Sequence, residues 1–181
     1  MKMMARSIPE RHHGGAMDAG GAGGRTLVLG LGNDILRDDG VGLVIVRELA
    51  KKYAGRGDIE VCETMEMGLA LLDFMVGFER VILVDSIQTG RVAPGVLHVV
   101  DVGGWRELSG STPHFLGVGE TLALGRQLGL DMPADVQVVA VEVEDPFALG
   151  TDLTLAVAGA VEPAVGRVSR LLEMGLASAA G

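Results

Sequence analysis

The sequence LVLGLGNDILRDDGVG, residues 27–42, decides the fold class, because it runs from a short apolar segment through a glycine-rich turn into a helix. The apolar residues at its start are typical of a buried strand. Val41, Ile45 and Leu49 then recur at helical spacing, which predicts a helix from about residue 40 to residue 54. A strand that passes directly into a helix is typical of an α/β fold.

The Gly-x-Gly of this turn, Gly30 and Gly32, does not complete a dinucleotide-binding fingerprint. The position of the third glycine is occupied by Ile35. Asp38 and Asp39 stand at the helix N-terminus, where a phosphate would bind, and their carboxylates would repel it. One aspartate suffices to cap the helix, so the other is left over. A carboxylate in this place favours a cation as ligand.

The rest of the chain alternates strand and helix patterns. Further strands are predicted over residues 59–64, 80–87, 96–102 and 135–143, and further helices over 68–77, 118–129 and 154–174. Pro163 falls inside the last helix, so either this helix kinks or two helices meet there. The pattern predicts a three-layer α/β sandwich with a mostly parallel five-stranded sheet, one antiparallel pair and helices on both faces. The antiparallel pair is expected because only a short turn separates the third strand from the fourth.

A single domain over residues 26–181 is consistent with the length of 181 residues. Residues 1–25 are polar and glycine-rich, and we expect a disordered N-terminal extension there, because such a segment buries too little apolar surface to offset the cost of ordering it. In open α/β sheets, ligands bind beyond the carboxyl ends of the strands. The functional residues are therefore sought in the turns that follow the strands.

The composition excludes several classes of protein. The net charge is −9 and the chain has no basic stripe, so nucleic acid is not an expected partner. No apolar run reaches the roughly 18 residues of a membrane span, and the N-terminus lacks the apolar region of a secretory signal. A cytoplasmic protein is the prediction. Cys62 is the only cysteine, which excludes an internal disulfide and a cysteine-rich metal site.

Three residues of these turns are candidates for one metal site. Asp85 ends an apolar strand, and His114 lies in an irregular loop before a helix. Taken singly, Asp85 also suits a turn cap and His114 an exposed loop histidine. Together with Asp39, they supply two carboxylates and one imidazole from separate loops, which is a donor set for an open site that holds a borderline divalent metal.

Other residues with reactive or metal-binding side chains have weaker cases. Cys62 lies inside a strand and is expected to be a small buried hydrophobe. Ser86 follows Asp85 without a Gly-x-Ser-x-Gly context. His98 alternates within a strand and is expected to be packed or at the surface. Met65 and Met67 are expected to fill core rather than to bind metal.

Four segments, in this order, resemble the nickel-iron hydrogenase maturation endopeptidases. These segments are LGLGNDILRDDGVG, VILVDSI, STPHFLG and LTLAVAGAVEPAV, and the resemblance extends from about residue 26 to residue 175. In that family a carboxylate of the first motif, an aspartate that ends the third strand and a histidine before the next helix bind nickel. On this sequence they match Asp39, Asp85 and His114, which the resemblance marks as both metal-binding and catalytic.

The resemblance implies an endopeptidase that removes a C-terminal peptide from a nickel-iron hydrogenase large-subunit precursor after nickel insertion. The nickel would belong to the substrate, so the protein would have no metal cofactor of its own, although zinc or cadmium would occupy the site in vitro. The nickel-loaded precursor is then the expected partner, and a monomer the expected state. Whether the metal polarises the peptide carbonyl or activates water, or a carboxylate acts as base, is left open by the sequence.

Two other functions are compatible with the same residues. A non-catalytic nickel-binding docking or chaperone protein would use the same three ligands without cleaving the precursor. A hydrolase or nucleotide-binding α/β enzyme unrelated to hydrogenase would bind a different ligand at the carboxyl edge of the sheet.

Overall fold

The structure is a computed structural model that describes residues 24–101 and 118–179. The strands are β1 (Thr26–Leu31), β2 (Ile59–Thr64), β3 (Arg80–Ile87), β4 (Leu97–Asp101) and β5 (Asp135–Glu142). The helices are α1 (Val41–Lys52), α2 (Leu72–Met75), α3 (Val118–Gln127), α4 (Leu155–Ala158) and α5 (Val161–Ala179), with short 3-10 helices η1 (Asp38–Gly40) and η2 (Gly68–Leu71).

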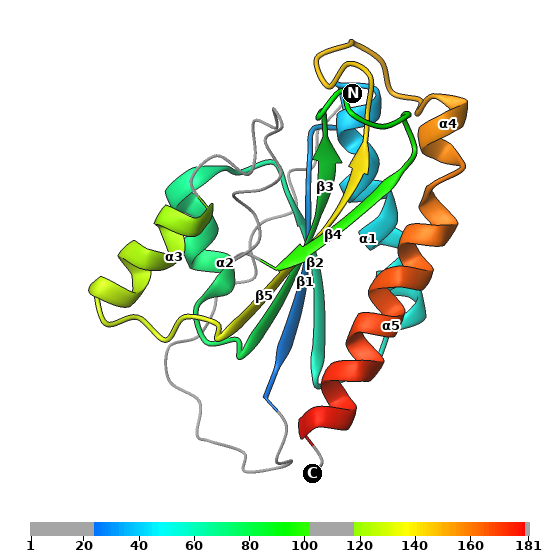
Figure 1. The fold of residues 1–181 in the computed structure, drawn as a ribbon. Coiled ribbons are helices and arrows are strands. Elements are labelled where there is room, and N and C mark those ends of the chain that lie inside the picture. The colour runs from blue at the N-terminus through cyan, green and yellow to red at the C-terminus, as the bar shows by residue number, and fades with distance from the viewer. Residues whose placement is uncertain (1–23, 102–117, 180–181) are drawn as a thin grey trace, which may run out of the picture.

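The strands form one five-stranded sheet in the order β2-β1-β3-β5-β4. Helices α1, α4 and α5 lie on one face of this sheet and α2 and α3 on the other, so the molecule has three layers (Figure 1). All neighbouring strands are parallel except β4 and β5. The predicted three-layer α/β fold with one antiparallel pair is confirmed. The antiparallel partner of β4 is β5, however, and not β3, because β5 is inserted between them.

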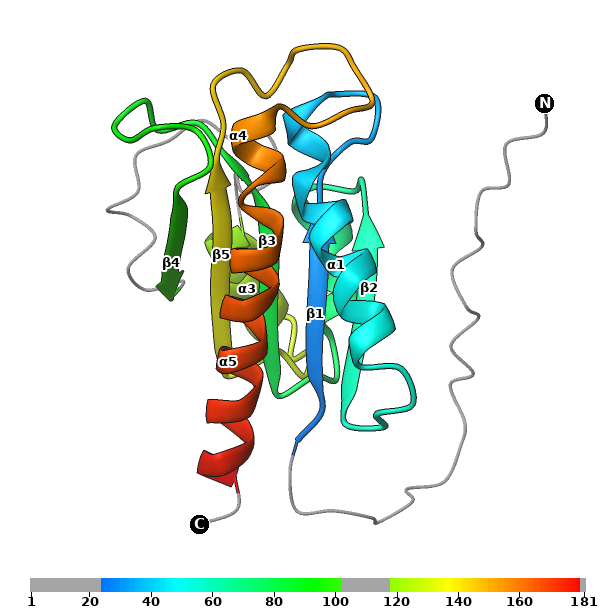
Figure 2. The same cartoon turned by 90° about the vertical axis from the view of Figure 1, so that its right-hand side faces the viewer.

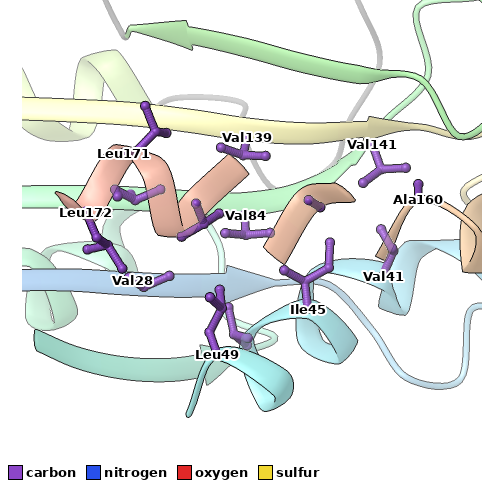
Figure 3. Packing of buried hydrophobic residues seen from close by; sticks show 14 of the residues in the cluster. Val28, Val41, Ile45, Leu49, Val84, Val139, Val141, Ala160, Leu171 and Leu172 are labelled. Atoms are coloured by element: carbon purple, nitrogen blue, oxygen red, sulfur yellow. The ribbon is translucent and has the colours of Figure 1, made fainter. Parts of the chain in front are cut away.

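The central strands are apolar on both faces, as expected for strands covered by helices on either side. On one face, valines of the sheet such as Val28 and Val84 pack against Ile45 and Leu49 of α1 and against the inner side of α5 (Figure 3). On the other face, the alternate residues of the same strands pack against α2 and α3. The two clusters cover the two faces of the sheet.

The predicted elements differ from the observed ones mainly in two helices. The helix predicted over residues 68–77 is a single 3-10 turn followed by one turn of α2, and Gly77 ends it with a φ of 81°. The last helix is divided into α4 and α5. Pro163 lies in the first turn of α5, where its missing N–H removes no helical hydrogen bond, so it begins a helix rather than kinking one.

Of the predicted N-terminal extension, residues 1–25, the structure describes only Gly24 and Arg25. The guanidinium of Arg25 donates a hydrogen bond to Glu60 at 2.6 Å and lies 4.8 Å from the ring centre of Phe78. Across residues 24–101 and 118–179, the helices are too short or too polar to span a membrane.

Helix α1 approaches the ends of β1 and β3 so closely that its second residue must be glycine. A Cβ atom on Gly42 would lie 2.2 Å from the carbonyl oxygen of Leu31 and 2.5 Å from that of Val84. Gly32, with a φ of 143°, has the same role in the turn before the helix, since its Cβ would lie 2.2 Å from the carbonyl oxygen of Asp39. Gly32 and Gly42 therefore serve the close packing of the turn and the helix, and not the binding of a phosphate.

We expect the substitution Gly42→Ala to destabilise the fold by about 3 kcal/mol or more, because the new methyl group collides with backbone atoms that have no room to move. Urea unfolding followed by far-UV circular dichroism measures the change. Gly119→Ala is the matched control, since the added methyl group on α3 meets no atom within 4 Å, and it leaves stability unchanged or raises it by up to about 1 kcal/mol. Equal unfolding midpoints for the two variants would show that α1 does not need this close approach.

Candidate functional site

Asp39 and Asp85 are brought together at the carboxyl edge of the sheet. Asp39 lies in η1, the turn between β1 and α1, and Asp85 lies near the end of the adjacent strand β3. The close approach of α1 at Gly42 brings η1 against the end of β3. Both carboxylates are fully buried.

Ser86 links the two carboxylates. Its hydroxyl donates a hydrogen bond to Oδ1 of Asp39 at 2.9 Å, and its backbone N–H donates one to Oδ1 of Asp85 at 2.7 Å. Ser86 is itself fully buried and belongs to the side of β3 that faces α1, whereas Asp85, in the alternation of a strand, belongs to the side that faces α2 and α3. This serine was not expected to contribute. Its position directly after Asp85 was the only signal in the sequence.

The adjacent aspartates Asp38 and Asp39 have different tasks, and neither is the N-cap of α1. That position is occupied by Gly40, with no side-chain capping bond, because η1 precedes the helix. Asp38 instead accepts two hydrogen bonds from Thr154, at 2.7 Å from its backbone N–H and at 2.9 Å from its hydroxyl. The prediction that one of these aspartates caps α1 is therefore wrong. Asp38 ties the β1–α1 turn to the start of α4, and Asp39 turns toward β3.

His114, the third predicted ligand, lies outside the described residues. The described residues contain no group of three His, Cys, Asp or Glu side chains that forms a metal site by itself. Asp39 and Asp85 supply oxygen donors only. Each of these carboxylates is fully buried, so its negative charge needs compensation by a proton or by a bound cation.

Another buried carboxylate, that of Glu142, lies close to the same edge and was missed in the sequence. It ends β5, in register with Ile87, and is 1% exposed. Its carboxylate accepts hydrogen bonds of 2.8 Å from the backbone N–H groups of Thr89 and Gly90 and from the Thr89 hydroxyl. The Nε2 atom of His98 lies 2.8 Å from the same carboxylate. The sequence contained a signal for Glu142, because a charged residue that ends an apolar strand is the same pattern that identified Asp85.

His98, expected to be packed or at the surface, is half-buried, and its partner explains why it does not join the aspartates. Across the sheet, His98 is in register with Ala140, which is in register with Asp85. His98 therefore lies two strands away from Asp85, and its ring is engaged by Glu142. Glu142 fixes the turn between β3 and β4 and has no visible part in binding a ligand.

The methionines Met65 and Met67 are exposed and do not fill core as expected. They follow the last residue of β2, an edge strand, and lie between that strand and η2. Cys62 is half-buried in β2, and its thiol lies 3.6 Å from the carboxylate of Glu60. Neither the thiol nor the methionines lie in the site around Ser86.

The fold and the site define an α/β protein with a buried pair of carboxylates at the carboxyl edge of its sheet, the usual place for ligands in such folds. A model of the hydrogenase maturation protease family matches residues 43–171, a range that includes Asp85 and His114 and begins after Asp39. The Hydrogenase 2 maturation protease of Escherichia coli K12 is 30% identical over 146 residues, covering 80% of this chain and 88% of that protein.

Solved structures agree with this match. The hydrogenase maturating endopeptidase HybD from E. coli superposes with a TM-score of 0.70 at 31% identity, over 83% of this chain and 94% of that chain. The [NiFe] hydrogenase maturation protease HybD from Thermococcus kodakarensis gives a TM-score of 0.65 at 25% identity, over 81% and 98%. The chain belongs to the hydrogenase maturation protease family.

Proposed function

We propose that this protein is the endopeptidase that removes the C-terminal peptide from a nickel-iron hydrogenase large-subunit precursor once nickel has been inserted. The observation that carries the proposal is the pair Asp39 and Asp85, two fully buried carboxylates from separate elements that meet at Ser86. Membership of the hydrogenase maturation protease family supplies the reaction class. The same proposal places the reaction in the cytoplasm and the enzyme in a monomeric state.

In this proposal the nickel ion is part of the substrate. The carboxylates of Asp39 and Asp85 and the imidazole of His114 complete the coordination of a nickel ion that the precursor already holds. Imidazole suits nickel, and carboxylates are harder donors, so a site of this composition binds a free ion weakly and depends on the ligands that the precursor contributes. A precursor without nickel then lacks the ion that these three residues bind.

The described residues offer little support for an acyl-enzyme intermediate. Ser86 is fully buried, and its hydroxyl donates a hydrogen bond to Asp39. His98, the one histidine of the described residues, lies against Glu142. Cys62 is half-buried on β2 and lies beside Glu60. Direct attack of water on the peptide carbonyl is therefore the proposed step, with water adding its hydroxyl group to the carbonyl carbon and a proton to the leaving amine.

The experiment that tests this function mixes the purified protein with nickel-loaded precursor and follows the precursor by intact-mass spectrometry. We expect a loss of mass equal to a C-terminal peptide. A precursor that binds the protein and keeps its full mass would show a docking or chaperone protein instead. Precursor treated with buffer alone is the control for spontaneous cleavage.

A further inference from the structure

The turn that carries Asp39 lies beside a second loop, and the two form one surface, which we call the loop pair. It consists of residues 32–37, between β1 and η1, and residues 144–155, from the end of β5 into α4. Both loops leave the sheet at the same edge, in the upper part of Figure 2. The backbone N–H of Arg37 donates to the carbonyl of Ala148 at 2.9 Å, and that of Gly150 donates to the carbonyl of Ile35 at 3.1 Å.

Asp38 joins the two loops of the loop pair through hydrogen bonds. It is 3% exposed, and its two hydrogen bonds to Thr154 join the end of one loop to the end of the other. Asp145 adds a bond within its own loop, because its Oδ1 accepts the backbone N–H of Phe147 at 2.9 Å. The loop pair is therefore a fixed surface, which lowers the entropy cost of binding a partner.

This fixed surface exposes large apolar side chains. Ile35 and Phe147 are each 60% exposed, Leu149 is 78% exposed and Leu155 is 94% exposed. Single exposed apolar residues are ordinary, but four on two hydrogen-bonded loops next to a buried functional site are typical of a surface that binds another protein. Large apolar anchors with a polar surround are also what carries most of the energy in protein interfaces.

The charged side chains of the loop pair indicate the chemistry of the partner. Its exposed carboxylates are Asp34, Glu144, Asp145 and Asp152, and its only cation is Arg37. Four negative charges against one positive charge leave the surface at −3, within a chain of net charge −9. Complementarity of charge requires lysine or arginine on the partner.

We infer that the loop pair is the docking surface for the precursor, and that it binds a segment in which apolar side chains lie next to lysine or arginine. This inference rests on the proposed function, since that function makes the precursor the protein that must reach Asp39 and Asp85. The loop pair continues directly into Asp39, so a precursor bound there lies beside the carboxylates. Docking on this surface is separate from recognition of nickel and adds to it.

The test measures the affinity of the protein for nickel-loaded precursor by biolayer interferometry, together with KM and kcat for cleavage. The double substitution Leu149→Ser, Leu155→Ser removes the two most exposed anchors. We expect it to raise Kd and KM at least about tenfold, as loss of interface anchors does, with kcat unchanged. The matched control is Leu128→Ser, Met174→Ser, which removes two exposed apolar side chains outside the loop pair and leaves Kd unchanged.

A second variant tests the charge and does not depend on the first. The double substitution Asp34→Lys, Asp152→Lys is expected to raise Kd at low salt and to weaken its dependence on salt, because screened attraction between charges is lost. Thermal melting shows that each variant is folded before it is compared.

The outcomes separate the docking surface from the proposed function. If the unaltered protein cleaves the precursor and both double variants keep its Kd and KM, the docking inference is wrong and the function stands. If the unaltered protein binds the precursor without cleaving it, while the loop-pair variants bind more weakly, the docking inference stands and the proposed peptidase activity is wrong. A fall in kcat at unchanged Kd would also overturn the docking inference.

Discussion

Replacing Asp85 by asparagine is expected to abolish cleavage of the nickel-loaded precursor and to leave the fold intact. Asparagine keeps the size of the side chain and an oxygen acceptor for the backbone N–H of Ser86, so the hydrogen bond at 2.7 Å is preserved. What is lost is the negative charge. The cleavage rate should fall at least about 100-fold, the lower end of what one positioned acid–base group contributes, with a larger fall if the charge also binds the metal.

The variants Asp39→Asn and His114→Ala should have the same effect on cleavage. For Asp39 the amide oxygen still accepts the hydroxyl of Ser86, so the contact at 2.9 Å is retained while the charge is removed. The control is Asp131→Asn, an exposed aspartate in the loop before β5, at the opposite edge of the sheet, which keeps the full rate. Rates come from intact-mass measurements over time, and folding from circular dichroism.

Two results would change the assignment of these residues. Cleavage at the normal rate by the Asp85→Asn variant would remove Asp85 from the site. Unfolding of that variant would show that the buried carboxylate is needed for the structure of the sheet edge. The cleavage rates of the Asp39→Asn and His114→Ala variants would then be the test of the site.

The second large effect concerns where the nickel must be. We expect metal-stripped protein to cleave nickel-loaded precursor at the full rate, and nickel-supplemented protein to leave a nickel-free precursor uncut. The reason is that the described part of the site offers two carboxylates and no thiolate, a donor set that holds a borderline metal weakly without further ligands. The isolated protein should accordingly purify without stoichiometric metal and bind nickel, zinc or cadmium weakly.

The measurement combines each preparation of the protein with each preparation of the precursor. Protein and precursor are each prepared with and without nickel, with metal content checked by elemental analysis, and the four mixtures are followed by intact mass. Precursor loaded with zinc is the control for occupancy of the site without nickel. Cleavage only in mixtures where the protein carries the metal would show that the metal is a cofactor of the enzyme, and the proposal of substrate-borne nickel would then be wrong.

The sequence by itself determined the class of fold and the main elements. The strands at residues 59–64 and 80–87 were predicted with the bounds that the structure has, because apolar runs that end in turn residues depend on local pattern alone. Asp85 was found for the same reason, as a charge that ends an apolar strand. The partner of β4 was not determined, since insertion of β5 between β3 and β4 depends on contacts between distant segments.

Only the tertiary structure decided how the carboxylates are used. The sequence places Asp38 and Asp39 side by side with equal chemistry, and local rules give either of them to the helix cap. The structure separates them, because consecutive side chains point in different directions from the η1 turn: Asp38 reaches Thr154, which is 116 positions away, and Asp39 reaches Ser86. Such bonds join residues that approach only when α1 packs against the sheet and α4 follows β5, so no local pattern encodes them.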